Sequence, residues 1–468
     1  MTLPERFKER TVSLLGADEA EALFRAIEGG EAVRAFRVNG IKSGVGEFEA
    51  SEPLIDRTKA EFPRDAYITR EEFPGSLPEH HSGAIYMQDI SAMSTVHAVK
   101  LDDGMRVLDS CSAPGGKTTQ LAAMVGDGGI VVANEYERKR CSILRSNVER
   151  MGCKNTVICN LDTVVLGEVY RGEFDLVLCD APCSGEGMFR KNERAVEEWS
   201  EENVKMCAER QREILTNVAK CVKVGGRLLY STCTFAVEEN EENVAWFLDS
   251  HPEFRLCRVD EELIANTSDG ICIEGCEYDM TLCRRVYPHK SLGEGQFIAL
   301  FERIDGADEA IECKKKEKKG KNCSDGKKNR AEVEAIGAAE KFLKENLLGL
   351  PDGELLMLGE SVFLSPRIAL PQFGVISAGI CVGECQKGRV VPHHQLFSAC
   401  GRDFKLKIEL SGKSAECEAY LRGEEIAAVG IGDNASGYCA VILDGCPVGG
   451  GKVSGGRCKN HYPKGLRN

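Results

Sequence analysis

The chain has 468 residues, with 74 Asp and Glu against 60 Lys and Arg and a formal net charge of −14 at pH 7. Its length predicts two to four domains, and 42% hydrophobic with 29% charged residues is typical of a soluble globular protein. No apolar run approaches the ~18–20 residues that a membrane span needs, and the start lacks the apolar region of a secretory signal, so we expect a cytoplasmic protein. The acidic balance excludes indiscriminate nucleic-acid binding but permits a local basic surface.

The 22 cysteines are scattered through the chain, which is typical of small core side chains in a reducing compartment. Two groups are close in sequence: Cys272, Cys276 and Cys283, and then Cys381 and Cys385. Neither group has the paired C-x2-C spacing of a zinc ribbon, so we expect no metal site.

Composition and patterning divide the chain into five regions. They are a small mixed region (1–75), a long regular region (76–302), a charged linker (303–332), a small domain (333–388) and a glycine-rich β module (389–468). We see no internal repeat.

In chain order, we expect an amphipathic helix at 19–27 and an extended segment at 35–40. Strand-like runs then follow at 105–109, 129–135, 156–160, 174–180, 226–232 and 295–301, with a helix at 204–218. Alternation of this kind predicts an α/β fold with a Rossmann-like, doubly wound parallel sheet.

A glycine-rich turn follows the first of these strands, in VLDSCSAPGGKTT (107–119). Gly115 and Gly116 would let the backbone approach a nucleotide triphosphate, a dinucleotide or S-adenosylmethionine. A P-loop needs glycine where Cys111 stands, and the dinucleotide pattern needs its glycines separated, so S-adenosylmethionine remains. Glu135, at the end of the next strand, suits the ribose hydroxyls, and Asp162, after the following one, suits the adenine amino group.

Two cysteines come after later strands, Cys183 in DAPCSGEG and Cys233 in YSTCTF. Both should lie at the carboxyl edge of the sheet, where open α/β sheets hold their ligands. A polar edge can lower the pKa of a thiol and make it a nucleophile. The charged run EENEEN (238–243) we interpret as a solvated helix start.

The motifs DSCSAPGGKTT, ANE, DAPCSGEGMFRK and YSTCTF, in this order, resemble the RNA cytosine-5 methyltransferase family that includes the Nol1/Nop2/Sun proteins. The resemblance implies a class I S-adenosylmethionine-dependent methyltransferase domain. It makes Cys233 the nucleophile that attacks carbon 6 of cytosine, and Cys183 the thiol that assists product release. It also implies that Asp180 binds the base near nitrogen 3, and that Lys117 lies close by and helps to lower a thiol pKa.

The same resemblance implies a set of cofactor contacts around the carboxyl edge. They are Asp109, Cys111, Ser112, Ala113, Pro114, Gly115, Gly116, Lys117, Glu135, Arg140, Asp162, Asp180 and Pro182.

The flanks resemble the family too. RVNG (37–40) and YMQDISAM (86–93) are similar to its N-terminal RNA-binding extension, and the end GRCKNHYPKGLRN is similar to the PUA-like RNA-binding tail of its bacterial, F-type branch. That branch implies 16S rRNA or the small ribosomal subunit as the partner, with tRNA kept open. Candidate RNA contacts are Arg37, Arg190, Lys191, Lys459, Lys464 and Arg467, with Arg284 and Arg285 as further positive charges near the site.

We expect a monomer that methylates RNA. The alternative of another class is a non-catalytic RNA-binding ribosome assembly factor, which would have no use for both cysteines.

Overall fold

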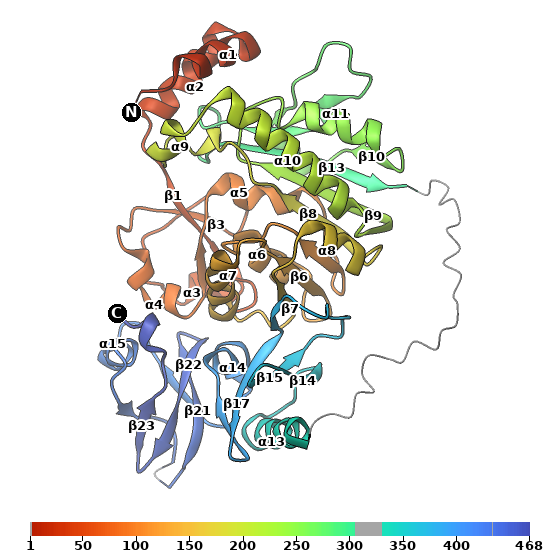
Figure 1. Cartoon of the computed structure of the whole chain (residues 1–468). Helices are drawn as coiled ribbons and strands as arrows, with labels where there is room; N and C mark the ends of the chain where they lie inside the picture. The colour runs from red at the N-terminus through yellow and green to blue at the C-terminus, as the bar shows by residue number, and fades with distance from the viewer. Residues whose placement is uncertain (1, 305–329, 433) are drawn as a thin grey trace, which may run out of the picture.

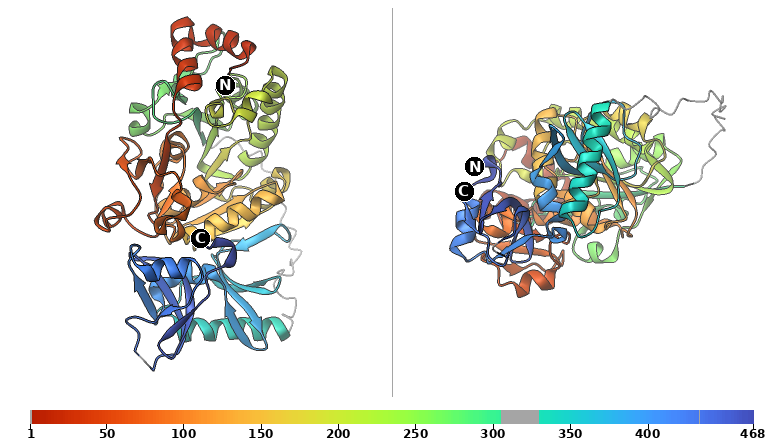
Figure 2. Two further views of the ribbon diagram at one scale, coloured as in Figure 1. Left: turned by 90° about the vertical axis from the view of Figure 1, so that its left-hand side faces the viewer. Right: turned by 90° about the horizontal axis from the view of Figure 1, so that it is seen from below.

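The computed structural model describes residues 2–304, 330–432 and 434–468. Figure 1 shows an N-terminal helix pair at the top, a central sheet through the middle and a C-terminal module below. Figure 2 shows the same arrangement from the side and from below. The predicted linker at 303–332 lies largely outside the described residues.

The N-terminal region combines a helix pair with a small sheet of order β2-β3-β1-β4. Its elements are α1 (Glu5–Leu15), α2 (Ala17–Gly29), β1 (Arg34–Val38), α3 (Val45–Ala50), β2 (Thr58–Lys59), β3 (Ala66–Thr69), α4 (Pro78–His81), β4 (Ile85–Met87) and α5 (Ile90–Ser94). The predicted helix and extended segment are observed as α2 and β1. Since β4 pairs with β1, this sheet continues past the domain end predicted at residue 75.

The central region alternates strands and helices as predicted. Its elements are β5 (Arg106–Asp109), α6 (Gly116–Met124), β6 (Ile130–Asn134), α7 (Arg138–Met151), β7 (Thr156–Cys159), α8 (Thr163–Val169), β8 (Phe174–Asp180), α9 (Glu193–Glu197), α10 (Glu201–Ala219), β9 (Val222–Thr232), α11 (Glu241–Ser250), β10 (Phe254–Cys257), α12 (Glu261–Ala265), β11 (Ser268–Asp269), β12 (Arg284–Val286) and β13 (Gln296–Arg303). All six predicted strands are present, which confirms the predicted fold class.

The sheet has the order β11-β12-β13-β9-β8-β5-β6-β7-β16, with β9, β8, β5, β6 and β7 parallel. From β5 the chain builds one half through β6 and β7, then returns to build the other through β8 and β9. Strand order therefore reverses between β5 and β8, and such a switch point is where open α/β sheets bind ligands at the carboxyl edge.

Two buried clusters cover the faces of this sheet. Val107 lies in one cluster with Leu121 of α6 and Leu144 of α7, whereas the next residue, Leu108, lies in the other cluster with Leu215 of α10. Successive strand side chains point to opposite faces, so helices on both sides bury nearly continuous apolar strands. This is why the strand sequences show little alternation.

The C-terminal module begins with a helix and contains two further sheets. Its elements are α13 (Arg330–Asn346), β14 (Glu354–Leu358), β15 (Ser361–Ser365), β16 (Val375–Ala378), β17 (Ile380–Gln386), β18 (Arg389–Pro392), α14 (His394–Cys400), β19 (Lys407–Leu410), α15 (Ala415–Leu421), β20 (Ile426–Ala427), β21 (Gly437–Leu443), β22 (Cys446–Ser454) and β23 (Arg457–Asn460). The sheets have the orders β14-β15-β17-β18 and β19-β21-β22-β23-β20. The domain boundary predicted at 388/389 falls inside the β17–β18 hairpin.

Strand β16 joins this module to the central sheet. It pairs antiparallel with β7, placing Val375 opposite Cys159 and Ala378 opposite Val157. The predicted small domain at 333–388 therefore contributes an edge strand to the central sheet. Covering an edge strand in this way also protects its unpaired backbone groups.

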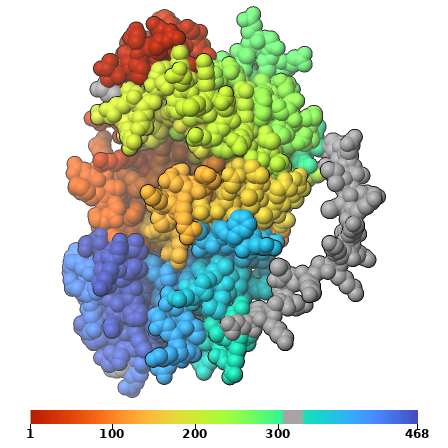
Figure 3. Space-filling model, in the orientation of Figure 1, coloured from red at the N-terminus to blue at the C-terminus, as the bar shows by residue number. Residues whose placement is uncertain are grey.

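The module also packs against the N-terminal region, as the space-filling view shows (Figure 3). Lys42 is 2% exposed and donates hydrogen bonds to Ser398 Oγ (3.1 Å) and the Pro447 carbonyl (2.7 Å). Burial lowers the pKa of Lys42 to about 7. His81 Nδ1 lies 2.8 Å from the Tyr462 hydroxyl. These contacts join the N-terminal region to the C-terminal module.

Arg37 links the N-terminal sheet to the glycine-rich turn. It is 1% exposed and donates to Gln88 Oε1 (3.0 Å), the Gly116 carbonyl (2.8 Å) and Thr119 Oγ1 (2.6 Å). Burial lowers its pKa to about 10, which leaves it charged at pH 7. The prediction that Arg37 contacts RNA is corrected, because its guanidinium is occupied inside the protein.

Replacing Arg37 by Met should destabilise the protein by about 2–4 kcal/mol, because two buried acceptors and the half-buried Gln88 side chain lose their donor. Urea unfolding measures this. The matched control is Arg34→Met, an exposed position on the same strand, where we expect a change within about 0.5 kcal/mol. Equal effects in the two variants would show that Arg37 is not a structural link.

Candidate active site

The two motif cysteines meet at the carboxyl edge of the central sheet. Parallel pairing places Asp180, the last residue of β8, opposite Ser231 near the end of β9. Cys183 lies three residues beyond β8 and Cys233 directly follows β9, and their sulfurs are 3.3 Å apart. Both are half-buried. The structure therefore brings together two thiols that are 50 residues apart in sequence.

These sulfurs share a hydrogen bond. The bond with Cys233, reinforced by burial, raises the pKa of the Cys183 thiol well above its ordinary value. The expectation that the polar edge lowers thiol pKa values is wrong for Cys183, because the group facing it is a second thiol. Cys183 thus keeps its proton, which it can donate to the Cys233 sulfur.

An ion pair lies beside the thiols. Lys117, on the first turn of α6, donates to Asp180 Oδ2 at 2.7 Å, and Ser231 Oγ donates to Oδ1 at 2.6 Å. Burial alone would lower the pKa of Lys117, but the Asp180 carboxylate outweighs it, so the pKa is raised. Lys117 also interacts electrostatically with Cys233. A carboxylate and a fixed cation therefore face the same space as the sulfurs.

The glycine-rich turn connects β5 to α6 at this edge. Gly115 has φ +108°, a conformation that side-chain-bearing residues rarely adopt, and a Cβ there would also meet Leu144 at 3.1 Å. Ser112 Oγ donates to the Asn134 carbonyl at 2.7 Å and fixes the turn to the end of β6. The predicted turn residues from Cys111 to Gly116 accordingly lie together above β5.

The two acids predicted after β6 and β7 have different surroundings. Glu135 is 4% exposed, accepts a hydrogen bond from the Ala113 amide (3.3 Å) and pairs with Arg140 at 3.3 Å. Arg140 in turn donates to the Ala113 carbonyl at 2.7 Å. Asp162 is exposed and caps α8 by accepting from the Val164 amide at 2.8 Å. Glu135 and Arg140 therefore brace the turn, while Asp162 has a capping role as well as any ligand contact.

The residues fit S-adenosylmethionine. Asp109 ends β5, its Oδ2 accepts from Thr118 Oγ1 at 2.6 Å, and its Oδ1 is buried without a hydrogen-bond partner. A buried carboxylate oxygen in this state costs free energy, which a ligand ammonium group would relieve. With the open backbone at Gly115 and the acid at Glu135, the edge could hold the amino acid and ribose parts of that cofactor.

Several predicted RNA contacts are engaged within the protein. Arg190 pairs with Glu294 at 3.0 Å and Lys191 with Asp89 at 2.8 Å. Arg285 is 1% exposed. Four further positions are placed differently: Arg284 is buried, Arg467 donates to the Tyr462 carbonyl, and Lys459 and Lys464 are exposed at the chain end. The positive charge predicted near the site is thus reduced, because Glu294, Asp89 and Glu241 pair with Arg190, Lys191 and Arg285.

The sequence interpretation missed the buried polar residues behind the thiols. In the EENEEN run, Glu239, Asn240, Glu241 and Asn243 are each 0% exposed, so the prediction of a solvated helix start is wrong for them. Arg285 pairs with Glu241 at 2.5 Å. The available signal was the density of Glu and Asn immediately after a motif cysteine.

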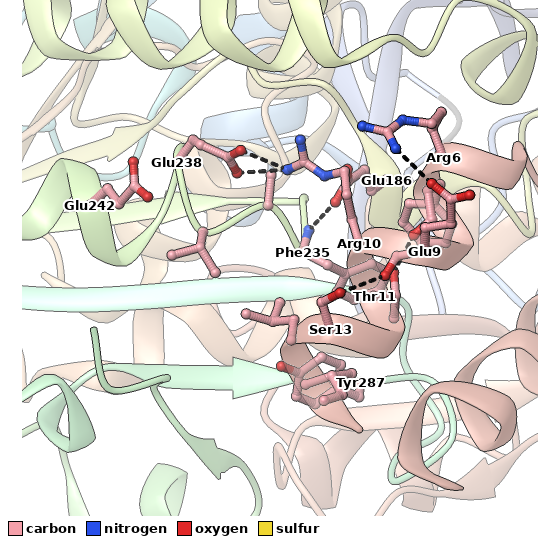
Figure 4. Close-up of a pocket in the computed structure, with 15 residues that line it drawn as sticks. Arg6, Glu9, Arg10, Thr11, Ser13, Glu186, Phe235, Glu238, Glu242 and Tyr287 are labelled. Atoms are coloured by element: carbon pink, nitrogen blue, oxygen red, sulfur yellow. Dashed lines mark hydrogen bonds and ion pairs between the residues drawn. The ribbon is translucent and has the colours of Figure 1, made fainter. Parts of the chain in front are cut away.

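A cavity lies beside the loop that follows β9, between this loop and α1 (Figure 4). Arg10 of α1 donates to both oxygens of Glu238, at 2.8 and 2.7 Å. Phe7 of α1 contacts Phe189 edge-on at 5.1 Å between ring centroids. The N-terminal helix therefore supports the Cys233 loop from outside the sheet.

Comparison with known proteins gives matches along most of the chain. Residues 96–302 match the family described as 16S rRNA methyltransferase RsmB/F. Residues 3–90 match the N-terminal domain of 16S rRNA methyltransferase RsmF, and residues 405–468 match the methyltransferase RsmF PUA domain.

Curated relatives and solved structures agree. The ribosomal RNA small subunit methyltransferase F of Cronobacter sakazakii is 31% identical over 92% of this chain and 90% of its own, and that of Vibrio cholerae is 29% identical over 100% and 98%. A methyltransferase homolog from Pyrococcus horikoshii superposes with a TM-score of 0.56 at 29% identity, covering 64% of this chain and 95% of its own. NSun6 from the same organism, with SFG, gives 0.54 at 20% identity over 65% and 99%, a likeness of fold alone.

The fold, the glycine-rich turn and the paired thiols together define an S-adenosylmethionine-dependent RNA cytosine-5 methyltransferase. The predictions of enzyme class and cofactor are confirmed. The chain belongs to the 16S rRNA methyltransferase RsmB/F family, and its N-terminal and PUA domains place it with the RsmF-like members.

Two further observations concern the described part of the chain. Within residues 2–304, 330–432 and 434–468, no three His, Cys, Asp or Glu side chains gather as a metal site requires. In the same ranges, no helix has the combined length and apolar character needed to cross a bilayer.

Burial raises the pKa of Asp109 to about 7, from an ordinary value of 3.8. The folded state therefore binds a proton more tightly than the unfolded state, and the cost of ionising Asp109 grows as pH rises from about 4 to 7. The Tm of Asp109→Asn minus the Tm of wild type should therefore be roughly 2–4 °C larger at pH 8 than at pH 5.5. Thermal melts at both pH values test this, with exposed Asp102→Asn as the control. A Tm difference between variant and wild type that stays the same at both pH values would contradict the raised pKa of Asp109.

Proposed function

We propose that this enzyme methylates carbon 5 of a cytosine in 16S rRNA, with Cys233 as the nucleophile and Cys183 as the releasing thiol. The observation that carries the proposal is the 3.3 Å pairing of two sulfurs from separate strands at the cofactor edge. A protein that only binds RNA would have no need of this pair. The family of the chain and its bacterial relatives support 16S rRNA as the substrate and the cytoplasm as the place of reaction.

The chemistry needs a covalent step, because carbon 5 of cytosine is a poor nucleophile. The Cys233 thiolate adds to carbon 6 and forms a carbon–sulfur bond, which moves electron density onto carbon 5. Asp180, fixed by Lys117 and Ser231, stabilises nitrogen 3 as it takes up a proton from solvent during this attack, and that proton leaves again when Cys233 is released. S-adenosylmethionine, when bound, supplies the methyl group that carbon 5 accepts.

Cys183 changes role once the adduct exists. Its pKa is raised mainly by the hydrogen bond with the Cys233 sulfur. When that sulfur becomes a neutral thioether this main cause is removed, so Cys183 can release its own proton to solvent and, as the thiolate, take the carbon 5 proton. The electrons of the broken C–H bond restore the carbon 5–carbon 6 double bond, the carbon 6–sulfur bond breaks, and Cys233 leaves as the thiolate.

The target base must leave its stack to reach sulfurs that are half-buried. The substrate is therefore a single-stranded or looped region of RNA. Exposed Lys459 and Lys464 on the PUA domain are the predicted cationic positions that remain available to phosphates.

Incubation with labelled S-adenosylmethionine and, separately, small ribosomal subunits, naked 16S rRNA and total tRNA tests the substrate. We expect label in 16S rRNA, and bisulfite sequencing to place it at a cytosine. Label only in tRNA would keep the chemistry and overturn the substrate, whereas no label in any RNA would favour a binding factor.

Cys183→Ala should accumulate a denaturant-stable protein–RNA adduct, because carbon 5 keeps its proton. Cys233→Ala should form none, and both variants should lose at least about 100-fold in turnover. A denaturing gel with labelled RNA measures the adduct. The buried Cys179→Ala, on β8, is the matched control. An adduct in the Cys233 variant would reverse the assignment.

A further inference from the structure

Two buried carboxyl groups cross between the loops that carry the thiols, the Cys183 loop (181–187) and the Cys233 loop (233–240). Glu239 belongs to the Cys233 loop and is 0% exposed. Its Oε2 accepts from the Ser184 amide at 3.0 Å and from Gln211 Nε2 at 2.7 Å, and its Oε1 contacts Ser184 Oγ. Glu239 therefore holds the Cys183 loop.

Glu186 makes the corresponding contacts from the Cys183 loop to the Cys233 loop. It belongs to the Cys183 loop and is 2% exposed. Its Oε2 accepts from Thr234 Oγ1 at 3.1 Å and from the Phe235 amide at 3.0 Å, the contact drawn in Figure 4. Its Oε1 accepts from Trp199 Nε1 at 2.8 Å. Glu186 therefore holds the Cys233 loop.

Each carboxyl group binds the residue next to the other loop's cysteine. Ser184 directly follows Cys183 and Thr234 directly follows Cys233, and their hydroxyls are 2.8 Å apart. Polar atoms within hydrogen-bond distance of one another thus run in a chain from Glu239 through Ser184 and Thr234 to Glu186. This chain runs directly behind the two sulfurs.

The arrangement is costly for the fold. Burial raises the pKa of Glu239 to about 7 and also raises the pKa of Glu186. Apolar side chains of similar size would often be as stable or more stable at such positions. Stability alone does not account for two buried carboxyl groups here, whereas control of sulfur position does, because a displacement of 1 Å costs up to ~100-fold in rate.

We propose, on the basis of the function proposed above, that Glu186 and Glu239 are positioning residues with separate tasks. Glu239 holds Cys183 in place for release of the product, and Glu186 holds Cys233 in place for attack on carbon 6. Neither carboxyl group is assigned a contact with the base.

Alanine variants separate the two tasks. Glu239→Ala should resemble Cys183→Ala and accumulate the RNA adduct by roughly 10-fold, whereas Glu186→Ala should resemble Cys233→Ala and lower it by roughly 10-fold. Both should bind S-adenosylmethionine within about 2-fold of wild type by calorimetry, which shows that the fold is intact. The control is Glu242→Ala, an exposed glutamate in the same run. Shifts of the adduct in the same direction, or no shift, would overturn the proposal.

Glutamine variants keep the test decisive if an alanine variant does not fold. At position 239 the amide can still accept from Ser184 N and Gln211 through its oxygen and donate to Ser184 Oγ, so Glu239→Gln should keep near-wild-type adduct levels. At position 186, hydrogen-bond donors face both carboxyl oxygens. In Glu186→Gln the side-chain NH2 group would therefore face another donor, and we expect a lower level of adduct. Equal impairment of both glutamine variants would show a need for charge and overturn the positioning account.

The cysteine variants, run on the same gel, distinguish a failure of the proposed function from a failure of the positioning proposal. If Cys183→Ala does not accumulate adduct, the division of labour between the thiols fails whatever the glutamates do. If it does and Glu239→Ala does not, only the positioning proposal fails.

Discussion

The parallel pairing of β8 with β9 is the constraint on which the active site depends. Its register sets Cys179 opposite Tyr230 and Asp180 opposite Ser231, so the two strands end side by side at the same edge of the sheet. Two loops then bring sulfurs from positions 183 and 233 to 3.3 Å. Because β5 pairs with the other side of β8, the glycine-rich turn and Lys117 reach the same edge. The order of β5, β8 and β9 in the sheet thus brings the glycine-rich turn next to the two cysteines.

The site is stabilised from behind by buried polar groups. Glu186 and Glu239 hold the thiol loops, Arg285 neutralises Glu241, and Tyr230 donates to the Glu239 carbonyl at 2.6 Å. Satisfied networks of this kind are rigid, but each is costly if one member is removed. The N-terminal region takes part as well, through Arg37 below the turn and α1 beside the Cys233 loop. It is therefore a structural part of the enzyme.

The C-terminal module is attached by secondary structure. Strand β16 continues the central sheet beyond β7, and buried Lys42 joins the N-terminal region to α14 and β22. The PUA domain thus has a defined position relative to the thiols, despite the long charged segment that precedes the module in sequence. An RNA bound by Lys459 and Lys464 would therefore be held at a fixed distance from the two sulfurs.

The sequence by itself determined the strand succession, the glycine-rich turn and the two cysteine motifs, because apolar runs, paired glycines and short motifs are local patterns. It could place Cys183 and Cys233 at one edge, but not measure their spacing. Only the tertiary structure decided that Arg37 is buried, that Glu239 and Glu241 face inward, and that β16 extends the central sheet. Whether a charged side chain is solvated or buried depends on the partners that distant segments bring to it, and neither composition nor spacing contains that information.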